Sequence, residues 1–406
     1  MPQFSNLPSI KEEGIAEEQM LMTLIIACLL LMPLKAFSTF STPLYGLTIL
    51  LETLFIVVSG KRIKGPELDM GLLAAAGALI LYLTARWIGG GGAGAERILQ
   101  TLLFLLTLIT FSRFCWNSQN VHRFYLALAV LMVACLAYWL VSGRVMNYYH
   151  AFYGHSNGFA VVIVATLAIT FLDARNGLKK QHWAIFFICA ALLAFANSRS
   201  AFLTIATFVL TTLLFMSQKK RRAASSARFL FAVAIVGALA FSIVYPSLLG
   251  TDLGRQLEFL SREYLNKNFF SGREVVWKMV LEAVSENQIF GLGLQVTPSM
   301  IYSTGLSSHN LYLQTVLQSG IVGLILLLTL FGAVLSRLCR KQTFSGCVGA
   351  SLLIAMMVHE CLEVALTQNN FNYGLLIWAV LGICLALNKD HLETSPTNNN
   401  NRKANQ

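Results

Sequence analysis

The stretch from Ser307 to Gly323 places four polar residues, SSHN, directly ahead of an apolar run. The run that begins at Leu311 predicts a helix entering a membrane, and Ser307 or Ser308 can cap its start. His309 then lies in the first turn, where the positive end of the helix dipole disfavours the imidazolium form. A neutral histidine can accept a proton, so we predict that His309 is a general base at the membrane surface. An interfacial histidine without a chemical role is the alternative.

Two arginines that precede His309 lie at predicted helix starts. Arg199, in ANSRSAFL, falls between two apolar segments, and an arginine at membrane depth costs about 2.5–3.5 kcal/mol. Such a residue usually faces a cavity or a partner, unless it snorkels to the interface. Arg273, in SGREVVW, falls in the first turn of a helix that Ser271 and Glu274 predict through an S-x-x-E capping box. The free N–H groups and the guanidinium favour an anion there, unless the arginine is simply solvated.

The two arginines and the histidine suit one type of reaction. A guanidinium binds phosphate oxygens in a bidentate manner. We predict that Arg199 and Arg273 stabilise a lipid diphosphate as it leaves a sugar, in place of a metal ion, and that His309 takes the proton of the attacking hydroxyl. The outer side carries no Asp-rich metal motif, and no cofactor is predicted.

Further polar residues stand at the outer ends of predicted spans. His155 and Asn157, in YGHSNGFA, begin one span, and we interpret Asn157 as a small polar cap. Arg144 precedes them nearby. His359 and Glu360 lie near the outer end of another span, where they either line a cavity or form a buried structural pair.

The elements that must position these residues are membrane-spanning helices. Of the 406 residues, 56% are hydrophobic and only 12% are charged, which is about half the charged share of a soluble protein. Apolar runs of about 20 residues recur, so we predict an all-α polytopic membrane protein with about twelve transmembrane helices. The eight cysteines form no C-x-x-C pair, which argues against a disulfide framework or a zinc site. The predicted spans are 20–37, 41–59, 69–87, 97–114, 124–142, 155–172, 183–197, 201–217, 229–246, 311–335, 346–362 and 371–388.

The basic residues set the orientation of these spans. With the N-terminus inside, the internal segments collect most of the 30 Lys and Arg residues. This predicts cytoplasmic termini and a site on the periplasmic side. The net charge of +11 follows from this topology, so no nucleic-acid partner is expected. The first 19 residues show no cleavable signal peptide.

One long connection divides the chain. We expect a cytoplasmic segment at 1–19, one transmembrane domain at 20–390 and a disordered cytoplasmic tail at 391–406, which is rich in Asn, Thr and Ser. Residues 247–310 form a large outer loop, long enough to have structure of its own. Within it, Arg273–Ile289 has apolar residues at helical spacing, which predicts an amphipathic helix that lies on the outer membrane boundary or caps the bundle.

The order of four motifs resembles the O-antigen ligase and polymerase superfamily of bacterial inner-membrane glycosyltransferases. The motifs are ANSRSAFL, GREVVW, IFGLGL and SSHNLYLQTVLQSGIVGL, within 196–324. The resemblance implies transfer of a glycan from undecaprenyl diphosphate on the periplasmic side, without a metal. It also implies that Arg199 and Arg273 bind the donor diphosphate, that His309 is the catalytic histidine, and that Asn310 caps or orients.

Several functions remain open. The first hypothesis is an O-antigen ligase-like, inverting glycosyltransferase of lipopolysaccharide synthesis, with lipid A–core as the acceptor and membrane lipids around it. A polymerase that extends the glycan from the same donor is the closest rival. A transporter of lipid-linked sugars belongs to another class, but the two halves show no clear repeat and the polar features gather on one side. A purely structural subunit gives no reason for a long outer loop.

Overall fold

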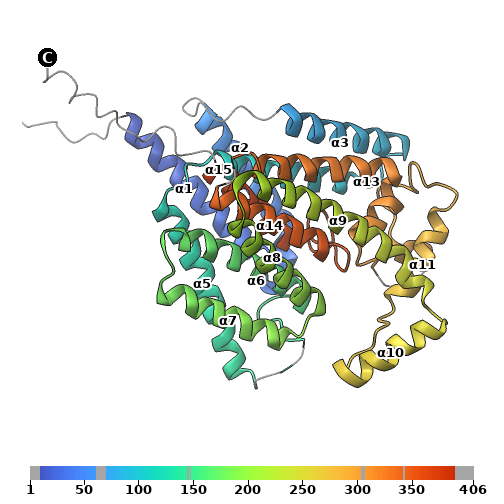
Figure 1. The fold of residues 1–406 in the computed structure, drawn as a ribbon. Coiled ribbons are helices and arrows are strands. Elements are labelled where there is room, and N and C mark those ends of the chain that lie inside the picture. Colours follow the sequence, from blue (N-terminus) through green and yellow to red (C-terminus); the bar gives the residue numbers. More distant parts are fainter. Residues whose placement is uncertain are drawn as a thin grey trace, which may run out of the picture.

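The computed structural model describes residues 10–60, 70–143, 146, 148–302, 307–341 and 343–388. Within them the regular elements are helices, apart from an isolated bridge between Leu34 and Tyr153. They pack into one bundle, in which α13 runs beside α3 and also packs against α9 (Figure 1). In chain order the elements are α1 (Ile10–Leu31), η1 (Lys35–Phe40), α2 (Ser41–Gly60), α3 (Met70–Gly89), α4 (Ala95–Arg113), α5 (Ser118–Val141), α6 (Ser156–Asp173), η2 (Ala174–Asn176), α7 (Lys180–Ala196), α8 (Arg199–Ser217), α9 (Lys220–Ser247), α10 (Asp252–Leu265), α11 (Arg273–Val284), α12 (Pro298–Tyr302), α13 (Leu311–Leu338), α14 (Phe344–His359) and α15 (Phe371–Leu387).

Each predicted span overlaps a helix of this bundle, although the span predicted at 20–37 runs past the end of α1 at Leu31. Within the described ranges, 8 helices are long and apolar enough to cross a membrane: α2 together with η1, α3, α4, α5, α6 together with η2, α8, α9 and α13. The apolar helices α7, α14 and α15 are shorter. The chain is thus an all-helical integral membrane protein, and the figure of about twelve spans stays a prediction. The predicted tail, 391–406, lies outside the described residues.

The centre of the bundle consists of α6, α14 and α15, whose residues are almost all buried. On α15, Trp378 stacks on Phe104 of α4, with ring centroids 4.5 Å apart. The surrounding helices expose large apolar side chains on their outer faces, such as Leu81 on α3, Val130 on α5 and Phe229 on α9. These faces suit a hydrocarbon solvent and would be unfavourable in water.

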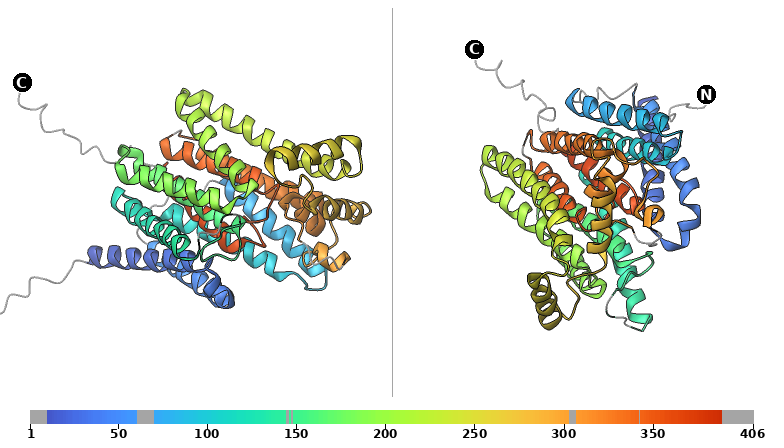
Figure 2. Two further views of the ribbon diagram at one scale, coloured as in Figure 1. Left: turned by 90° about the horizontal axis from the view of Figure 1, so that it is seen from below. Right: turned by 90° about the vertical axis from the view of Figure 1, so that its right-hand side faces the viewer.

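The long connection between α9 and α13 folds into three short helices, α10 to α12, at one end of the bundle (Figure 2). Val276, Trp277 and Val280 of α11 are buried in a cluster that includes residues of α9 and α13. This confirms the predicted amphipathic stripe. The helix ends at Val284 and not at Ile289, because the chain leaves it to reach α13.

α13 is interrupted at Gly320, whose φ of 67° lies in the left-handed region. A break of this kind frees backbone groups that a membrane interior cannot satisfy. The segment 288–293, which contains most of the IFGLGL motif, supplies partners, and Leu292 N donates to the Leu317 carbonyl at 2.8 Å. A Cβ at Gly320 would lie 2.1 Å from the carbonyl oxygen of Ile289. The long connection between α9 and α13, residues 248–310, therefore docks directly onto the broken helix. We call it the outer segment, after its predicted side of the membrane.

Candidate functional site

A cavity of about 570 Å³ lies where the outer segment meets the bundle. It brings together the three residues predicted to carry the chemistry. Arg199 is the first residue of α8, Arg273 is the first residue of α11, and His309 lies just before α13. The lining comprises Tyr148, Ser156, Asn157, Asn197, Ser198, Arg199, Ser200, Asn266, Lys267, Asn268, Phe270, Ser271, Gly272, Arg273, Val276, Ser307 and His309.

Arg273 owes its place to the start of α11. The Glu274 carboxylate accepts hydrogen bonds from the backbone N–H groups of Ser271 and Gly272, at 3.1 and 3.0 Å. Its predicted role as a capping partner is therefore confirmed. The predicted start at Ser271 is wrong, because Gly272 is the N-cap, with a φ of 88° that turns the chain into the helix. Arg273 does lie in the first turn, as predicted.

Arg199 owes its place to a cap on α8. The Ser198 side chain accepts a hydrogen bond from Ala201 N at 3.3 Å. The exposed Arg199 guanidinium reaches across to the outer segment, where Nη1 donates to the Asn268 carbonyl at 2.8 Å. This contact links α8 to the loop between α10 and α11.

His309 lies outside the helix that follows it. The Asn310 side chain caps α13 by accepting from Leu313 N at 3.0 Å, so the predicted capping role of Asn310 is confirmed. The prediction that Ser307 or Ser308 caps the helix, with His309 in its first turn, is wrong. The Ser307 hydroxyl oxygen instead accepts a hydrogen bond from His309 N at 3.4 Å. His309 itself has a φ of 45°, which is uncommon outside glycine.

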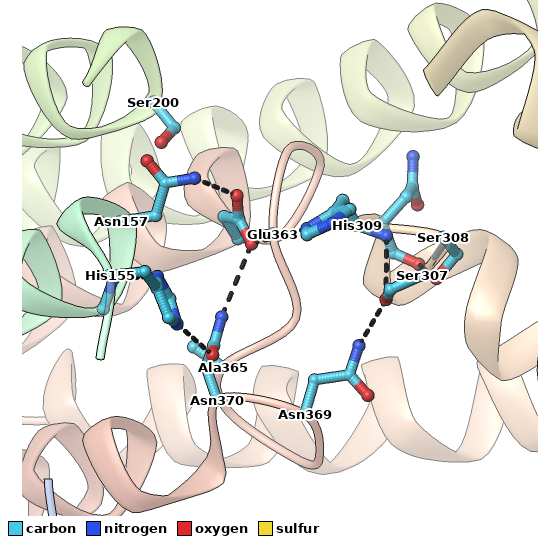
Figure 3. A network of polar contacts seen from close by, with 12 residues as sticks. His155, Asn157, Ser200, Ser307, Ser308, His309, Glu363, Ala365, Asn369 and Asn370 are labelled. Carbon is cyan, nitrogen blue, oxygen red and sulfur yellow. Dashed lines mark hydrogen bonds and ion pairs between the residues drawn. The ribbon is translucent and has the colours of Figure 1, made fainter. Parts of the chain in front are cut away.

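Glu363, between α14 and α15, joins the histidine to one arginine. Its carboxylate lies 2.9 Å from His309 Nδ1 and 2.9 Å from Arg273 Nη2. Asn157 and Asn370 also donate to it, and Figure 3 shows it between Asn157 on one side and His309 on the other. Burial alone would raise the pKa of Glu363, but the hydrogen bond and charge of His309 and the charge of Arg273 lower it below its ordinary value. The carboxylate is therefore charged at neutral pH.

These contacts set the tautomer of His309. An ionised carboxylate can only accept, so Nδ1 carries the hydrogen and Nε2 keeps its lone pair. The side chain is 40% exposed and lines the cavity, so Nε2 is open to a proton donor. Within the described residues, no group of three or more His, Cys, Asp or Glu side chains is placed to hold a metal ion.

The predicted cap at Asn157 is wrong, because His155 occupies that position. His155 Nδ1 accepts from Gly158 N at 3.0 Å, and its Nε2 lies 2.7 Å from Asn370 Oδ1. Asn157 does not cap the helix; its Oδ1 accepts a hydrogen bond from Ser198 Oγ at 2.6 Å, and its Nδ2 donates to the buried Glu363 carboxylate. Both residues thus support the site through hydrogen bonds.

The other minor candidates do not line the cavity. His359 Nδ1 lies 3.0 Å from the Thr204 hydroxyl, and the Glu360 carboxylate accepts from backbone N–H groups such as that of Ala365. Both are buried and have separate partners, so the buried structural interpretation fits, although not as a pair. Arg144 lies outside the described residues.

Lys267 is a third cation on the cavity wall that the sequence did not single out. Its ammonium donates to the backbone oxygen of Asn197 at 2.7 Å and to Asn197 Oδ1 at 2.5 Å. Burial, and after it the charge of Arg199, lowers the pKa of Lys267 below its ordinary value of 10.5. The only signal in the sequence is a lysine between two asparagines in the outer segment.

An apolar cavity of about 270 Å³ lies between α8, α9 and the end of α14. Its lining includes Leu203, one helical turn after Arg199, and Leu362, next to Glu363 in the sequence. Phe241 of α9 also lines it. The molecule thus has an apolar groove in addition to the cationic cavity, and α8 contributes a residue to each.

Residues 184–328 match a family model described as O-antigen ligase. The match runs from α7 into α13 and contains Arg199, Lys267, Arg273 and His309. The resemblance inferred from the motifs is confirmed over this region. The curated proteins contain no match to the chain.

Proposed function

We propose that this chain, which carries the O-antigen ligase region at 184–328, is an inverting inner-membrane glycosyltransferase. Its donor is a glycan on undecaprenyl diphosphate and its acceptor is a hydroxyl of lipid A–core. The observation that carries the proposal is the His309–Glu363 contact at 2.9 Å, on the wall of a cavity that also holds Arg199 and Arg273.

The donor end of the proposal follows from charge. A diphosphate leaving group needs positive charge where it departs, and guanidinium groups supply it without a metal ion. Arg199 and Arg273 stand on the cavity at the starts of two helices, whose free N–H groups also favour an anion. We assign both to the donor diphosphate, and we expect a chelator to leave the rate unchanged.

The lipid part of the donor follows from the apolar groove. Its residue Leu203 follows Arg199 of the cationic cavity by one helical turn, and Leu362 is next in sequence to Glu363, which contacts His309. A lipid diphosphate needs this combination, since its chain must remain in an apolar environment while its head group enters a polar one. A soluble nucleotide-sugar would have no use for the groove.

The chemical step is one displacement at the anomeric carbon. The acceptor hydroxyl oxygen forms a bond to that carbon while the bond to the diphosphate oxygen breaks, so the configuration inverts. His309 Nε2 takes the hydroxyl proton. The Glu363 carboxylate holds Nδ1–H and stabilises the imidazolium that forms, much as an aspartate does in a hydrolase triad. The diphosphate leaves with the bonding electron pair, beside the arginines.

The proposal is tested with purified protein in lipid nanodiscs, lipid-linked O-antigen and purified lipid A–core. His309→Ala should reduce transfer about 100- to 10,000-fold, because a positioned base contributes that much to the rate. Donor binding should persist, since the donor contacts are elsewhere. A well-folded His309→Ala protein with near-normal transfer would contradict the assigned base. A wild type that moves the donor across a bilayer without transfer would indicate a transporter.

The family match leaves a polymerase as the second candidate, because that rival uses the same donor. A lipopolysaccharide gel of the source bacterium separates the two. Deletion that leaves long polymer on the carrier and none on lipid A–core supports a ligase. Deletion that leaves core with a single repeat unit, without the longer ladder, supports a polymerase.

A further inference from the structure

The cations on the cavity differ in how their charge is balanced. Arg273 is paired with Glu363 at 2.9 Å. Arg199 and Lys267 contact only neutral oxygens, those of Asn268 and Asn197, and within the described residues no ion pair includes either of them. The wall of the cavity thus carries two positive charges that the protein leaves without a counter-charge.

Two like charges held together need an anion. Partial burial disfavours the ammonium form of Lys267, and the charge of Arg199 adds to that effect, so the pKa of Lys267 is lowered. An anion between them would relieve both effects. A diphosphate that links a lipid to a sugar carries one ionised oxygen on each phosphate, so its charge of about −2 matches the two unbalanced cations.

We propose that Lys267 and Arg199 set the affinity for the donor diphosphate, while Arg273, which is paired with Glu363, stabilises the same diphosphate mainly as it leaves in the chemical step. This inference rests on the proposed function. It divides the cations into a pair that sets donor affinity and an arginine that is coupled to the base.

The surroundings of Lys267 fit this role. Ser261 Oγ donates to the Lys267 carbonyl at 2.7 Å, and Asn266 ends α10 with a φ of 50°. The backbone of Lys267 is therefore fixed at the end of a helix. Asn197 accepts two of its three ammonium hydrogens, so the third is open to a phosphate oxygen.

The alternative is that Lys267 is only a tether between the outer segment and the turn at Asn197. Lys267→Arg and Asn197→Gly separate the two roles. The arginine keeps the charge. The glycine removes the Asn197 side chain but accepts the local backbone, whose φ is 49°. Lys278, exposed on α11 and absent from the cavity lining, is the matched control.

The experiment measures binding of undecaprenyl diphosphate, and of undecaprenyl monophosphate, to the full-length protein in nanodiscs. We expect Lys267→Ala to weaken diphosphate binding about tenfold, as expected for loss of one charge-assisted hydrogen bond, and monophosphate binding less. Lys267→Arg should restore most of the affinity, Asn197→Gly should lose clearly less than Lys267→Ala, and Lys278→Ala should match the wild type. Inorganic pyrophosphate should compete, but only at much higher concentration if the lipid chain contributes.

The outcomes separate the inference from the function on which it rests. A wild type that binds neither lipid overturns the proposed donor. A wild type that binds, with Lys267→Ala equally tight, overturns the role of Lys267 alone. Equal losses in Lys267→Ala and Asn197→Gly, without rescue by arginine, would make Lys267 a tether.

Discussion

Replacing Glu363 by Gln removes the charge beneath His309 and keeps the size of the side chain. At an effective dielectric constant of about 20, two unit charges 2.9 Å apart attract by about 6 kcal/mol. The imidazole is 40% exposed, so solvent screening leaves about half, or about 3 kcal/mol, for the imidazolium that forms during the reaction. Since about 1.4 kcal/mol corresponds to a tenfold change in rate, kcat should fall about 100-fold.

The same substitution releases Arg273 from its ion pair, so the KM for the donor should stay level or fall. Initial rates at varied donor concentration measure both quantities. Glu286→Gln, an exposed acid of the same outer segment, is the control. Glu363→Asp keeps the charge, so it serves as a second control that separates the loss of the charge from a loss of folding. A folded Glu363→Gln protein with kcat within about threefold of the wild type would refute the carboxylate–imidazole coupling argued here.

Three further predictions follow from the geometry. Gly320→Ala should destabilise the protein by roughly 2–5 kcal/mol, since the new Cβ meets the Ile289 carbonyl oxygen at 2.1 Å in a left-handed backbone. The control, Gly332→Ala in the same helix, should not lower the Tm. Equal Tm values for the two variants would contradict this prediction. Donor affinity should fall as the pH rises toward the lowered pKa of Lys267, because Lys267 loses its positive charge while the guanidinium groups of Arg199 and Arg273 keep theirs. Lys267→Arg should remove this decline in affinity at alkaline pH. A phosphatase reporter in the long outer segment should be active and one at the C-terminus inactive, whereas the reverse would invert the predicted topology.

The helical framework could be predicted because a bilayer restricts the choices. Each span must be apolar and must satisfy its own backbone hydrogen bonds, so hydropathy alone places it. The three cavity residues could be predicted because Arg199, Arg273 and His309 are polar residues beside apolar segments, in motifs of a known order. All three line one cavity, although their chemical roles stay predictions.

The partners of these residues could not be predicted in the same way. Glu363 is 54 residues from His309, and the packing of the end of α14 against the start of α13 brings the two side chains together. The sequence predicts two different caps for α13, because Ser307, Ser308 and Asn310 all have suitable side chains. The structure uses Asn310 and gives His309 a positive φ, and a single sequence does not reveal either choice.

The carboxylate that serves His309 lies outside the region matched by the family model, which ends at residue 328. Asn157, which holds that carboxylate from the other side, precedes the region. The matched stretch is therefore not a transferable module. A chimera that received only 184–328 from another protein would import the base and the cations but would depend on its host for the carboxylate. Exchange experiments between such proteins must carry positions 157 and 363 along with the matched stretch if the contacts of His309 are to be kept.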